Sequence, residues 1–133
     1  MPAEQSITIR VHYAQTDQMG VAHHSNWPVY WEECREELIR ARCKSYALLE
    51  SEDGILLPVV DFGAEILAPV HYDDLIEISC RVEEIGRVRA RFRYEARVAG
   101  VLVARGHTVH AVVDRDWKPT RLPAHVAESL RGG

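Results

Sequence analysis

The chain has 133 residues, of which 47% are hydrophobic and 27% are charged, and its formal net charge is −4. This size and composition predict one globular domain over residues 1–133 that can bury a core of its own. The acidic balance argues against a nucleic-acid partner, which would call for a basic surface.

The cysteines indicate a reducing compartment. Cys34, Cys43 and Cys80 are scattered and form no Cys-x-x-Cys pair. Such spacing predicts neither a zinc site nor a disulfide framework, and it favours a cytoplasmic location. The first residues show no targeting pattern, and no apolar run is long enough to span a bilayer.

The first predicted element is a half-buried strand over residues 6–13, because apolar and polar side chains alternate there. Its apolar face consists of Ile7, Ile9, Val11 and Tyr13. A polar loop follows over residues 14–25, and Gly20 within it is free to take a positive φ.

The longest helical pattern begins near Ser25 or Asn26, either of which is a good N-cap, and Pro28 fits the first turn. The pattern runs to about Leu49 and stops before Gly54, a residue suited to a helix C-terminus. Its apolar side consists of Trp27, Tyr30, Trp31, Cys34, Leu38, Ala41 and Ser45. A helix with such a wide apolar side needs a sheet to lie on.

The second half of the chain supplies that sheet. Period-two alternation and short turns predict strands over residues 57–67, 75–85, 87–98 and 101–113. In the first of these strands the side chains expected to point inward are Val60, Phe62, Ala64 and Ile66. A short helix is predicted from Pro123 to Leu130. The expected fold class is therefore α+β, with an antiparallel sheet of about five strands wrapped around one long helix.

The junction between the first strand and the long helix carries a motif. Its positions are Tyr13, Thr16, Asp17, Gly20, His24, Asn26, Tyr30 and Glu32. In this spacing the stretch resembles the 4-hydroxybenzoyl-CoA thioesterase-like family of hot-dog-fold acyl-CoA thioesterases. The resemblance implies hydrolysis of an acyl-CoA to a free acid and coenzyme A, with no cofactor other than the coenzyme A of the substrate. Many relatives have tyrosine where this chain has His23, so the acyl preference stays open.

The resemblance implies that Asp17 is the catalytic carboxylate. Thioester hydrolysis needs a carboxylate that attacks the carbonyl or activates a water, and it needs donors for the developing oxyanion. The backbone N–H groups at a helix start can be such donors, so we expect His24 to polarise the carbonyl. The plainer interpretation is that Asp17 bonds to nearby N–H groups in a turn and that His24 only begins the helix.

Four further residues are candidates on the strength of the motif. Tyr13 is a supporting catalytic residue, whereas Gly20, Asn26 and Glu32 are candidate substrate-binding residues. Each also has a structural interpretation: Tyr13 as a core aromatic at a strand end, Asn26 as a helix cap, and Glu32 on a solvated helix face. The arginines of residues 87–93 form either a solvated strand face or, with Arg105 or Lys118, a site for the phosphates of coenzyme A.

A metal site is not expected. The one candidate cluster consists of His12, Asp17, His23 and His24. These residue types suit zinc, but the helical His-x-x-x-His spacing typical of such sites is missing.

Two other functions of the same fold are alternatives. A hot-dog enoyl-CoA hydratase pairs an aspartate with a histidine five residues later, or a histidine with a glutamate on the helix. Ala22 occupies the position five residues after Asp17, with His23 and His24 just beyond it. A non-catalytic acyl-CoA-binding protein is the second alternative, and an assay of thiol release from acyl-CoAs separates all three.

The sequence also leads to an expectation about assembly. A single curved sheet leaves exposed edges, which pairing across a two-fold axis would cover. The resemblance implies dimers that often pair into tetramers. We therefore expect a homodimer at minimum and a homotetramer as the full assembly, with Asp17 of one chain facing residues 61–67 of another.

Overall fold

The structure is a computed structural model that describes residues 3–132, so Met1, Pro2 and Gly133 of the expected domain lie outside the described residues. In chain order the elements are β1 (Glu4–Arg10), the 3-10 turn η1 (Tyr13–Gln15), α1 (Asn26–Arg42), α2 (Tyr46–Leu48), the π-turn η2 (Leu49–Asp53), β2 (Ile55–Leu56), β3 (Val59–Ile66), β4 (Leu75–Ile85), β5 (Arg89–Val98), β6 (Val101–Ala111), β7 (Val113–Asp114) and α3 (Ala124–Arg131).

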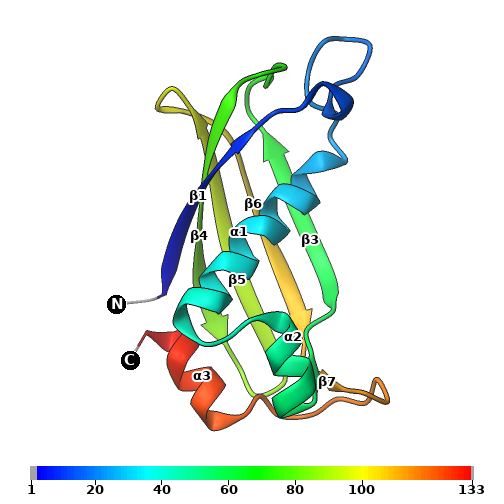
Figure 1. The fold of residues 1–133 in the computed structure, drawn as a ribbon, viewed down its shortest axis with the longest axis vertical. Helices are drawn as coiled ribbons and strands as arrows, with labels where there is room; N and C mark the ends of the chain where they lie inside the picture. The colour runs from blue at the N-terminus through cyan, green and yellow to red at the C-terminus, as the bar shows by residue number, and fades with distance from the viewer. Residues whose placement is uncertain (1–2, 133) are drawn as a thin grey trace.

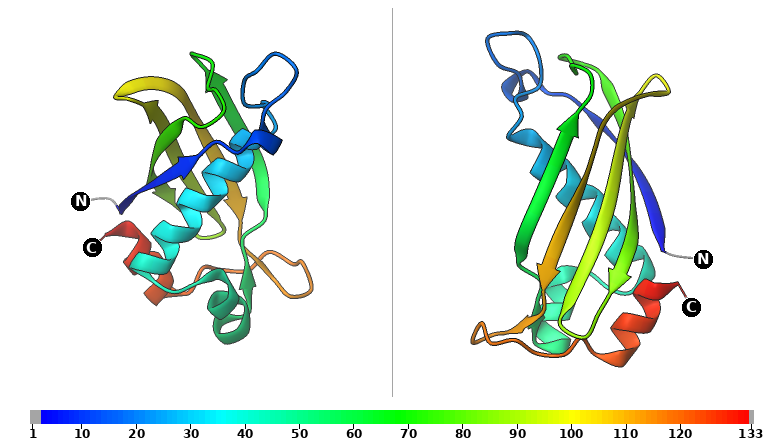
Figure 2. Two further views of the ribbon diagram at one scale, coloured as in Figure 1. Left: turned by 45° about the horizontal axis from the view of Figure 1, so that its top comes forward. Right: turned by 180° about the vertical axis from the view of Figure 1, so that it is seen from behind.

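The main sheet is antiparallel and five-stranded, with the strand order β1-β4-β5-β6-β3. Helix α1 runs across one face of this sheet, and α3 covers its lower end (Figure 1). Seen from behind, the opposite face of the sheet carries no helix (Figure 2). The predicted α+β hot-dog architecture is therefore confirmed. None of the helices in residues 3–132 is long and apolar enough to cross a membrane.

The core lies between α1 and the inner face of the central strands. The alternation predicted for β4 and β5 is confirmed, because Ile76, Ile78 and Cys80 are buried on β4 and Phe92 and Tyr94 on β5. The large aromatics of α1 fill the space above them, and Trp27, Tyr30 and Trp31 are each at most 1% exposed. Burial of such side chains is the main stabilising contribution to a domain of this kind.

Helix and sheet approach each other closely at Trp31. Its indole ring stacks on the Tyr94 ring with centroids 4.9 Å apart and an interplanar angle of 15°. The indole Nε1 also donates to the carbonyl of Gly63 at 3.3 Å. A Cβ atom at Gly106 would collide with that carbonyl and with the indole. The contact therefore depends on glycine in β6.

The long helix is shorter than predicted. It ends at Arg42 rather than near Leu49, because Cys43 leaves the helical region at φ −137° and ψ −89°. Ser45 then takes an extended conformation, and its Oγ accepts from the Leu48 N–H at 3.3 Å, which starts a new turn. Ala41 is exposed, so the predicted apolar side ends earlier as well. A local N-cap at Ser45 thus competes with continuation of the helix.

The first strand is also shorter than predicted. It ends at Arg10, and Tyr13 lies in the turn η1 with 76% of its surface exposed, so the expected core position for this ring is wrong. The turn forms because the Gln15 N–H bonds to the His12 carbonyl at 3.0 Å, which folds the chain back on itself.

The inward face predicted for β3 is not buried. Phe62 is 58% exposed and Ile66 is 48% exposed, although in register they lie opposite Thr108 and Ala104, which are buried on β6. The reason is position in the sheet: β3 is an edge strand, and its contact with α1 at Gly63 leaves Phe62 and Ile66 uncovered. Strand alternation identified the face of Phe62, Ala64 and Ile66 correctly, although a single chain does not cover it. The inward position predicted for Val60 is wrong, because a bulge between Val59 and Asp61 removes it from this register.

Candidate active site

The loop between β1 and α1 folds into a compact hairpin-like turn. The Asp17 N–H donates to the Val21 carbonyl at 2.9 Å, and the Gly20 N–H donates to the Asp17 carbonyl at 2.9 Å. Gly20 takes a φ of +83°, as the sequence predicted, and this conformation closes the turn. Asp17 lies at the beginning of this turn, and the end of the turn leads to the start of α1.

A residue that the sequence analysis missed, Gln15, joins this loop to the helix. Its backbone carbonyl accepts from the His23 N–H at 2.8 Å and from Asn26 Nδ2 at 2.7 Å. Its side-chain Oε1 accepts from the His12 N–H at 2.9 Å and from the Tyr30 hydroxyl at 3.1 Å. Gln15 therefore fixes the helix start relative to the strand end. Only its place two residues before Asp17 could have drawn attention to it.

The helix start differs from the predicted cap. Ser25 makes no side-chain capping bond, and its Oγ lies 2.8 Å from His23 Nδ1 instead. Asn26 holds the loop through Gln15 and also donates to the His23 carbonyl at 3.0 Å. Within residues 3–132 the His24 N–H has no hydrogen-bond acceptor. That N–H is available to a ligand at the positive end of the helix.

Asp17 is half-buried, and its two carboxylate oxygens differ. Oδ1 accepts from the Met19 N–H at 2.9 Å, so the plainer interpretation of a turn-forming aspartate is correct for one oxygen. Oδ2 has no partner in the part of the chain that the structure describes. The bond to one oxygen therefore fixes the orientation of the carboxylate and leaves the other oxygen without a partner in residues 3–132.

Asp17 and His24 line the same cavity, which has a volume of about 380 Å³. Its remaining walls come from the loop, from the first turn of α1, and from the end of β3 and the segment after it; they are Met19, Val21, Ala22, Trp27 and Ile66–Val70. The cavity thus combines mostly apolar side chains with a carboxylate and with residues at the start of α1, which is the usual form of a ligand site.

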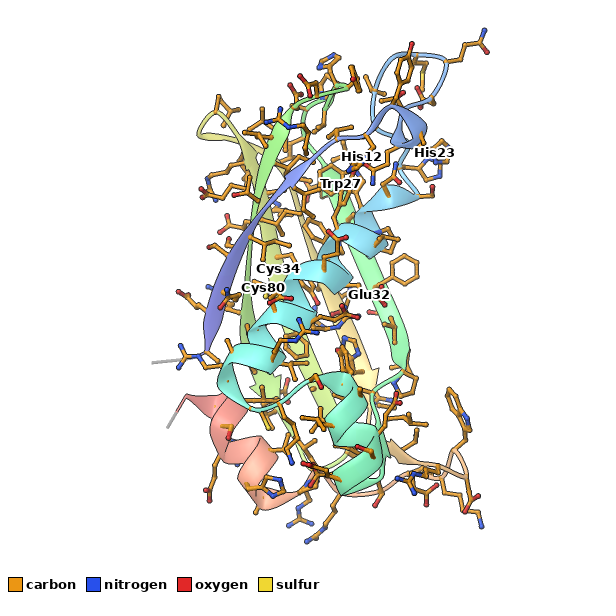
Figure 3. All side chains as sticks on the ribbon, viewed as in Figure 1. His12, His23, Trp27, Glu32, Cys34 and Cys80 are labelled. Carbon is orange, nitrogen blue, oxygen red and sulfur yellow. The ribbon has the colours of Figure 1, made fainter. Side chains whose placement is uncertain are left out.

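The other candidate residues do not line this cavity. Tyr13 packs against Tyr72 with ring centroids 4.9 Å apart. Glu32 lies part of the way along α1, away from the end of the helix near which His23 and Trp27 lie (Figure 3). Its carboxylate is 3.8 Å from the Arg35 guanidinium and largely exposed. A role of Tyr13 or Glu32 toward the substrate stays a prediction.

The histidines of the loop show no arrangement typical of a metal centre. The rings of His23 and His24 lie 4.2 Å apart at 30°, a packing contact between neighbours. Within residues 3–132 no group of three or more histidine, cysteine or acidic side chains is placed to hold a metal ion.

The arginine-rich face lies on the outer side of the sheet. Arg93 is 2.6 Å from Glu83, Arg97 is 3.3 Å from Glu95, and Arg105 is 3.1 Å from Glu65 on β3. These ion pairs are exposed and contribute little to stability. The loop that carries Lys118, between β7 and α3, lies at the opposite end of the molecule from the Asp17 loop (Figure 1). A contact with coenzyme A phosphates stays a prediction.

A second polar cluster is buried between the middle of α1 and the sheet. Arg35 is 4% exposed and donates to the Tyr94 hydroxyl at 3.2 Å. That hydroxyl is 2.5 Å from Thr108 Oγ1, which is 2.9 Å from His110 Nε2. His110 Nδ1 in turn lies 2.9 Å from the Leu57 carbonyl. Burial and then the Arg35 charge lower the pKa of His110 to about 4.

The chain is similar to known proteins both in sequence and in structure. Residues 19–110 match the family model described as the thioesterase superfamily. A Bacillus subtilis protein assigned provisionally as the acyl-CoA thioesterase YneP is 33% identical over 113 residues, covering 84% of this chain and 81% of that protein. The 1,4-dihydroxy-2-naphthoyl-CoA hydrolase of Nostoc punctiforme is 28% identical over 121 residues, covering 90% and 82%. The solved structure of a DHNA-CoA thioesterase from Staphylococcus aureus is similar with a TM-score of 0.85 and 31% identity, covering 90% of this chain and 80% of that one.

Proposed function

This chain belongs to the thioesterase superfamily of thioester hydrolases, and we propose that it hydrolyses acyl-CoA at the cavity beside the N-terminus of α1. The observation that carries the proposal is the shared cavity of Asp17 and His24. One oxygen of Asp17 and the N–H of His24 have no partner among residues 3–132, and this supports Asp17 as the attacking group or base and the His24 N–H as the oxyanion donor.

Two chemical roles of Asp17 are compatible with this geometry. Oδ2 either attacks the thioester carbonyl carbon, forming an acyl anhydride that water then opens, or takes a proton from an attacking water. In both cases the bond from carbonyl carbon to sulfur breaks, and coenzyme A leaves as a thiolate that gains a proton. Negative charge develops on the carbonyl oxygen, where the His24 N–H and the helix N-terminus stabilise it.

We propose a homodimer as the minimal assembly and a homotetramer as the full one. The exposed apolar side chains of the edge strand β3 support this, because an unpaired apolar edge is costly for a protein in water. The end of β3 leads directly into the cavity wall at Ile66 and Leu67. A second copy paired along β3 would place its own strand beside the site.

The proposal is tested by thiol release from a panel of acyl-CoAs with the Asp17→Asn protein. The amide keeps the shape and the bond from Met19 but removes the negative charge. Activity should fall by about a thousandfold or more, on the order of 4 kcal/mol of transition-state stabilisation, with thermal unfolding unchanged. Asp116→Asn, in the exposed loop after β7, is the matched control and should keep full activity.

Other outcomes would each favour a different conclusion. A folded Asp17→Asn protein with full activity would remove Asp17 from the mechanism. A wild-type protein that binds acyl-CoA without releasing thiol would be a binding protein. Addition of water to an enoyl-CoA without thiol release would identify a hydratase.

A further inference from the structure

One polar side-chain group in the cavity that contains Asp17 has no role in the proposed reaction, the indole N–H of Trp27. Trp27 lines the cavity from the first turn of α1 and is 1% exposed. Its Nε1 donates to no acceptor within residues 3–132. Among these residues, the side-chain nitrogens and oxygens that are both shut off from solvent and without a hydrogen bond are limited to one oxygen of Asp53. The indole N–H is therefore not sealed in the core, and it faces the cavity.

A buried tryptophan normally gives its N–H a partner, and Trp31, one turn further along α1, donates to the Gly63 carbonyl. The Trp27 ring has no such partner, yet its direction is fixed. It meets the Tyr30 ring edge-on with centroids 5.3 Å apart at 89°, and it lies 5.3 Å from the Trp31 ring at 41°. The donor is thus held in place before a ligand arrives, which reduces the entropy lost on binding.

Exposure separates a rim of the cavity from its floor. Met19 is 81% exposed, His24 is exposed and Asp17 is half-buried, so this side opens to solvent. Trp27 and Val70 are 1% and 2% exposed and form the floor. Under the proposed function the thioester lies at the rim and coenzyme A, which is large and polar, extends into solvent. The acyl group then reaches the floor.

The floor offers hydrogen-bond donors to that acyl group. In the part of the chain that the structure describes, the Val70 N–H makes no hydrogen bond, although its carbonyl accepts from the Ala22 N–H at 2.7 Å. The N–H of Val21, in the loop, has no acceptor there either. Indole and backbone N–H groups can only donate. An alkyl chain that displaces water from them leaves them unsatisfied, whereas an oxygen on the chain accepts from them.

We infer that the acyl group of the substrate carries an oxygen that accepts a hydrogen bond at its end away from the thioester, and that the indole N–H of Trp27 selects for this oxygen. The inference rests on the proposed function and narrows its substrate class. A ketone, ether or hydroxyl oxygen has the required chemistry. Trp27 binds the acyl group and takes no part in breaking the thioester, and a saturated acyl group of the same length is a poorer substrate.

The first test compares thioesters with and without a distal ketone at three depths. The substrates 4-oxopentanoyl-CoA, 5-oxohexanoyl-CoA and 6-oxoheptanoyl-CoA are each paired with the saturated acyl-CoA of the same chain length. In at least one pair kcat/KM should favour the oxo thioester about tenfold. Equal values in every pair, or a preference for the saturated chains, would overturn the inference while thioesterase activity remains. If neither these substrates nor acetyl-CoA release thiol, the proposed function fails instead.

The second test assigns the preference to Trp27. Trp27→Phe removes the N–H and keeps an aromatic ring. Trp31→Phe is the matched control, because Trp31 is also buried on α1 but donates to Gly63 and does not line the cavity. The preference for the oxo thioester should disappear in Trp27→Phe and persist in Trp31→Phe. A preference that persists in Trp27→Phe, or that is lost equally in both variants, would overturn the role of Trp27.

A third measurement uses the unaltered protein, so it decides the question even where a variant fails to fold. The indole N–H signals of the three tryptophans are followed by nuclear magnetic resonance in isotope-labelled protein. The ligands are thioether analogues of the 5-oxohexanoyl-CoA and hexanoyl-CoA pair, which cannot be hydrolysed. The Trp27 signal should move downfield with the oxygenated analogue alone, and the Trp31 signal should stay in place because its acceptor is Gly63. A Trp27 signal that responds equally to both analogues would show that the oxygen does not bind the indole.

Discussion

At the scale of single residues, the buried hydrogen bonds that link Arg35 to the Leu57 carbonyl all donate in one direction. Arginine can only donate and a carbonyl can only accept, so the Tyr94 hydroxyl donates to Thr108, which donates to His110 Nε2. His110 then donates through Nδ1 to Leu57 and is neutral. A proton added at Nε2 would face the Thr108 hydroxyl and the nearby Arg35 charge, which explains why the folded state resists protonation here.

This arrangement predicts an acid-sensitive contribution to stability. A histidine in the unfolded chain titrates near 6.5, whereas the pKa of His110 in the folded protein is about 4. Between these values the unfolded chain binds a proton that the folded chain does not, so stability falls as the pH is lowered through this window and is fully present above it. The loss between pH 7 and pH 4.5 should be about 2 kcal/mol.

Urea unfolding at the two pH values measures this loss. In His110→Gln, which can still donate and accept but does not titrate, the pH dependence should be smaller than in the wild type by that amount. His12→Gln, an exposed site, should retain the wild-type dependence. Equal pH dependence in the wild type and His110→Gln would show that His110 does not carry the effect.

The residue scale also shows what the motif could and could not predict. The positions of Asp17 and His24 at one cavity follow from a turn that ends at a helix start, which the spacing indicated. Gln15 and Arg35 escaped notice because polar residues in a loop or a helix are normally solvated. Their contacts depend on partners distant in the sequence, such as Tyr94 for Arg35. Only the tertiary structure identifies them.

At the scale of elements, the packing of α1 on β6 depends on the absence of a side chain at Gly106. Gly106→Ala would push a methyl group into the Trp31 indole and the Gly63 carbonyl, and a backbone atom cannot move aside cheaply. We expect a loss of about 3 kcal/mol in the free energy of unfolding, measured in urea. Gly86→Ala lies in the turn before β5, where a Cβ would be 3.4 Å from the Arg89 carbonyl, and it should change stability by less than about 1 kcal/mol. Similar losses in both variants would contradict this account.

The elements themselves were predictable to different degrees. The alternation that predicted β4 and β5 reports burial on one face, and both strands lie under the helix where that relation holds. The end of α1 was misplaced because Ser45 and the turn that follows share helical composition with the helix itself. Hydrophobic periodicity reports the spacing of apolar residues. It does not detect a local N-cap at which one helix ends and a new helical turn begins in another direction.

At the scale of the whole molecule, β3 combines an apolar inner face with an open edge. The alternation of its apolar side chains predicts a buried face, yet Phe62 is 58% exposed in a single chain. The conflict disappears if a second copy covers the strand, and this is why a sequence pattern can describe an assembly better than a protomer. The apolar wall of the cavity continues from the same strand, so assembly and activity should be linked.

A charge on this face tests that link. Phe62→Asp should prevent pairing along β3, because an unpaired carboxylate at the centre of an apolar interface is strongly unfavourable. Light scattering should then give a mass near that of one chain, 15.1 kDa, where the wild type gives a multiple of it. Thiol release from hexanoyl-CoA should fall at least about tenfold with the loss of the neighbouring strand.

The matched control is Val101→Asp, which puts the same charge on a side chain that is 61% exposed at the start of β6 and does not line the cavity. This variant should keep both its mass and its activity, because its carboxylate stays in water. A Phe62→Asp protein that is monomeric and fully active would show that each site is complete within one chain. A Phe62→Asp protein of unchanged mass would place the interface elsewhere, and the exposure of β3 would then need a different partner.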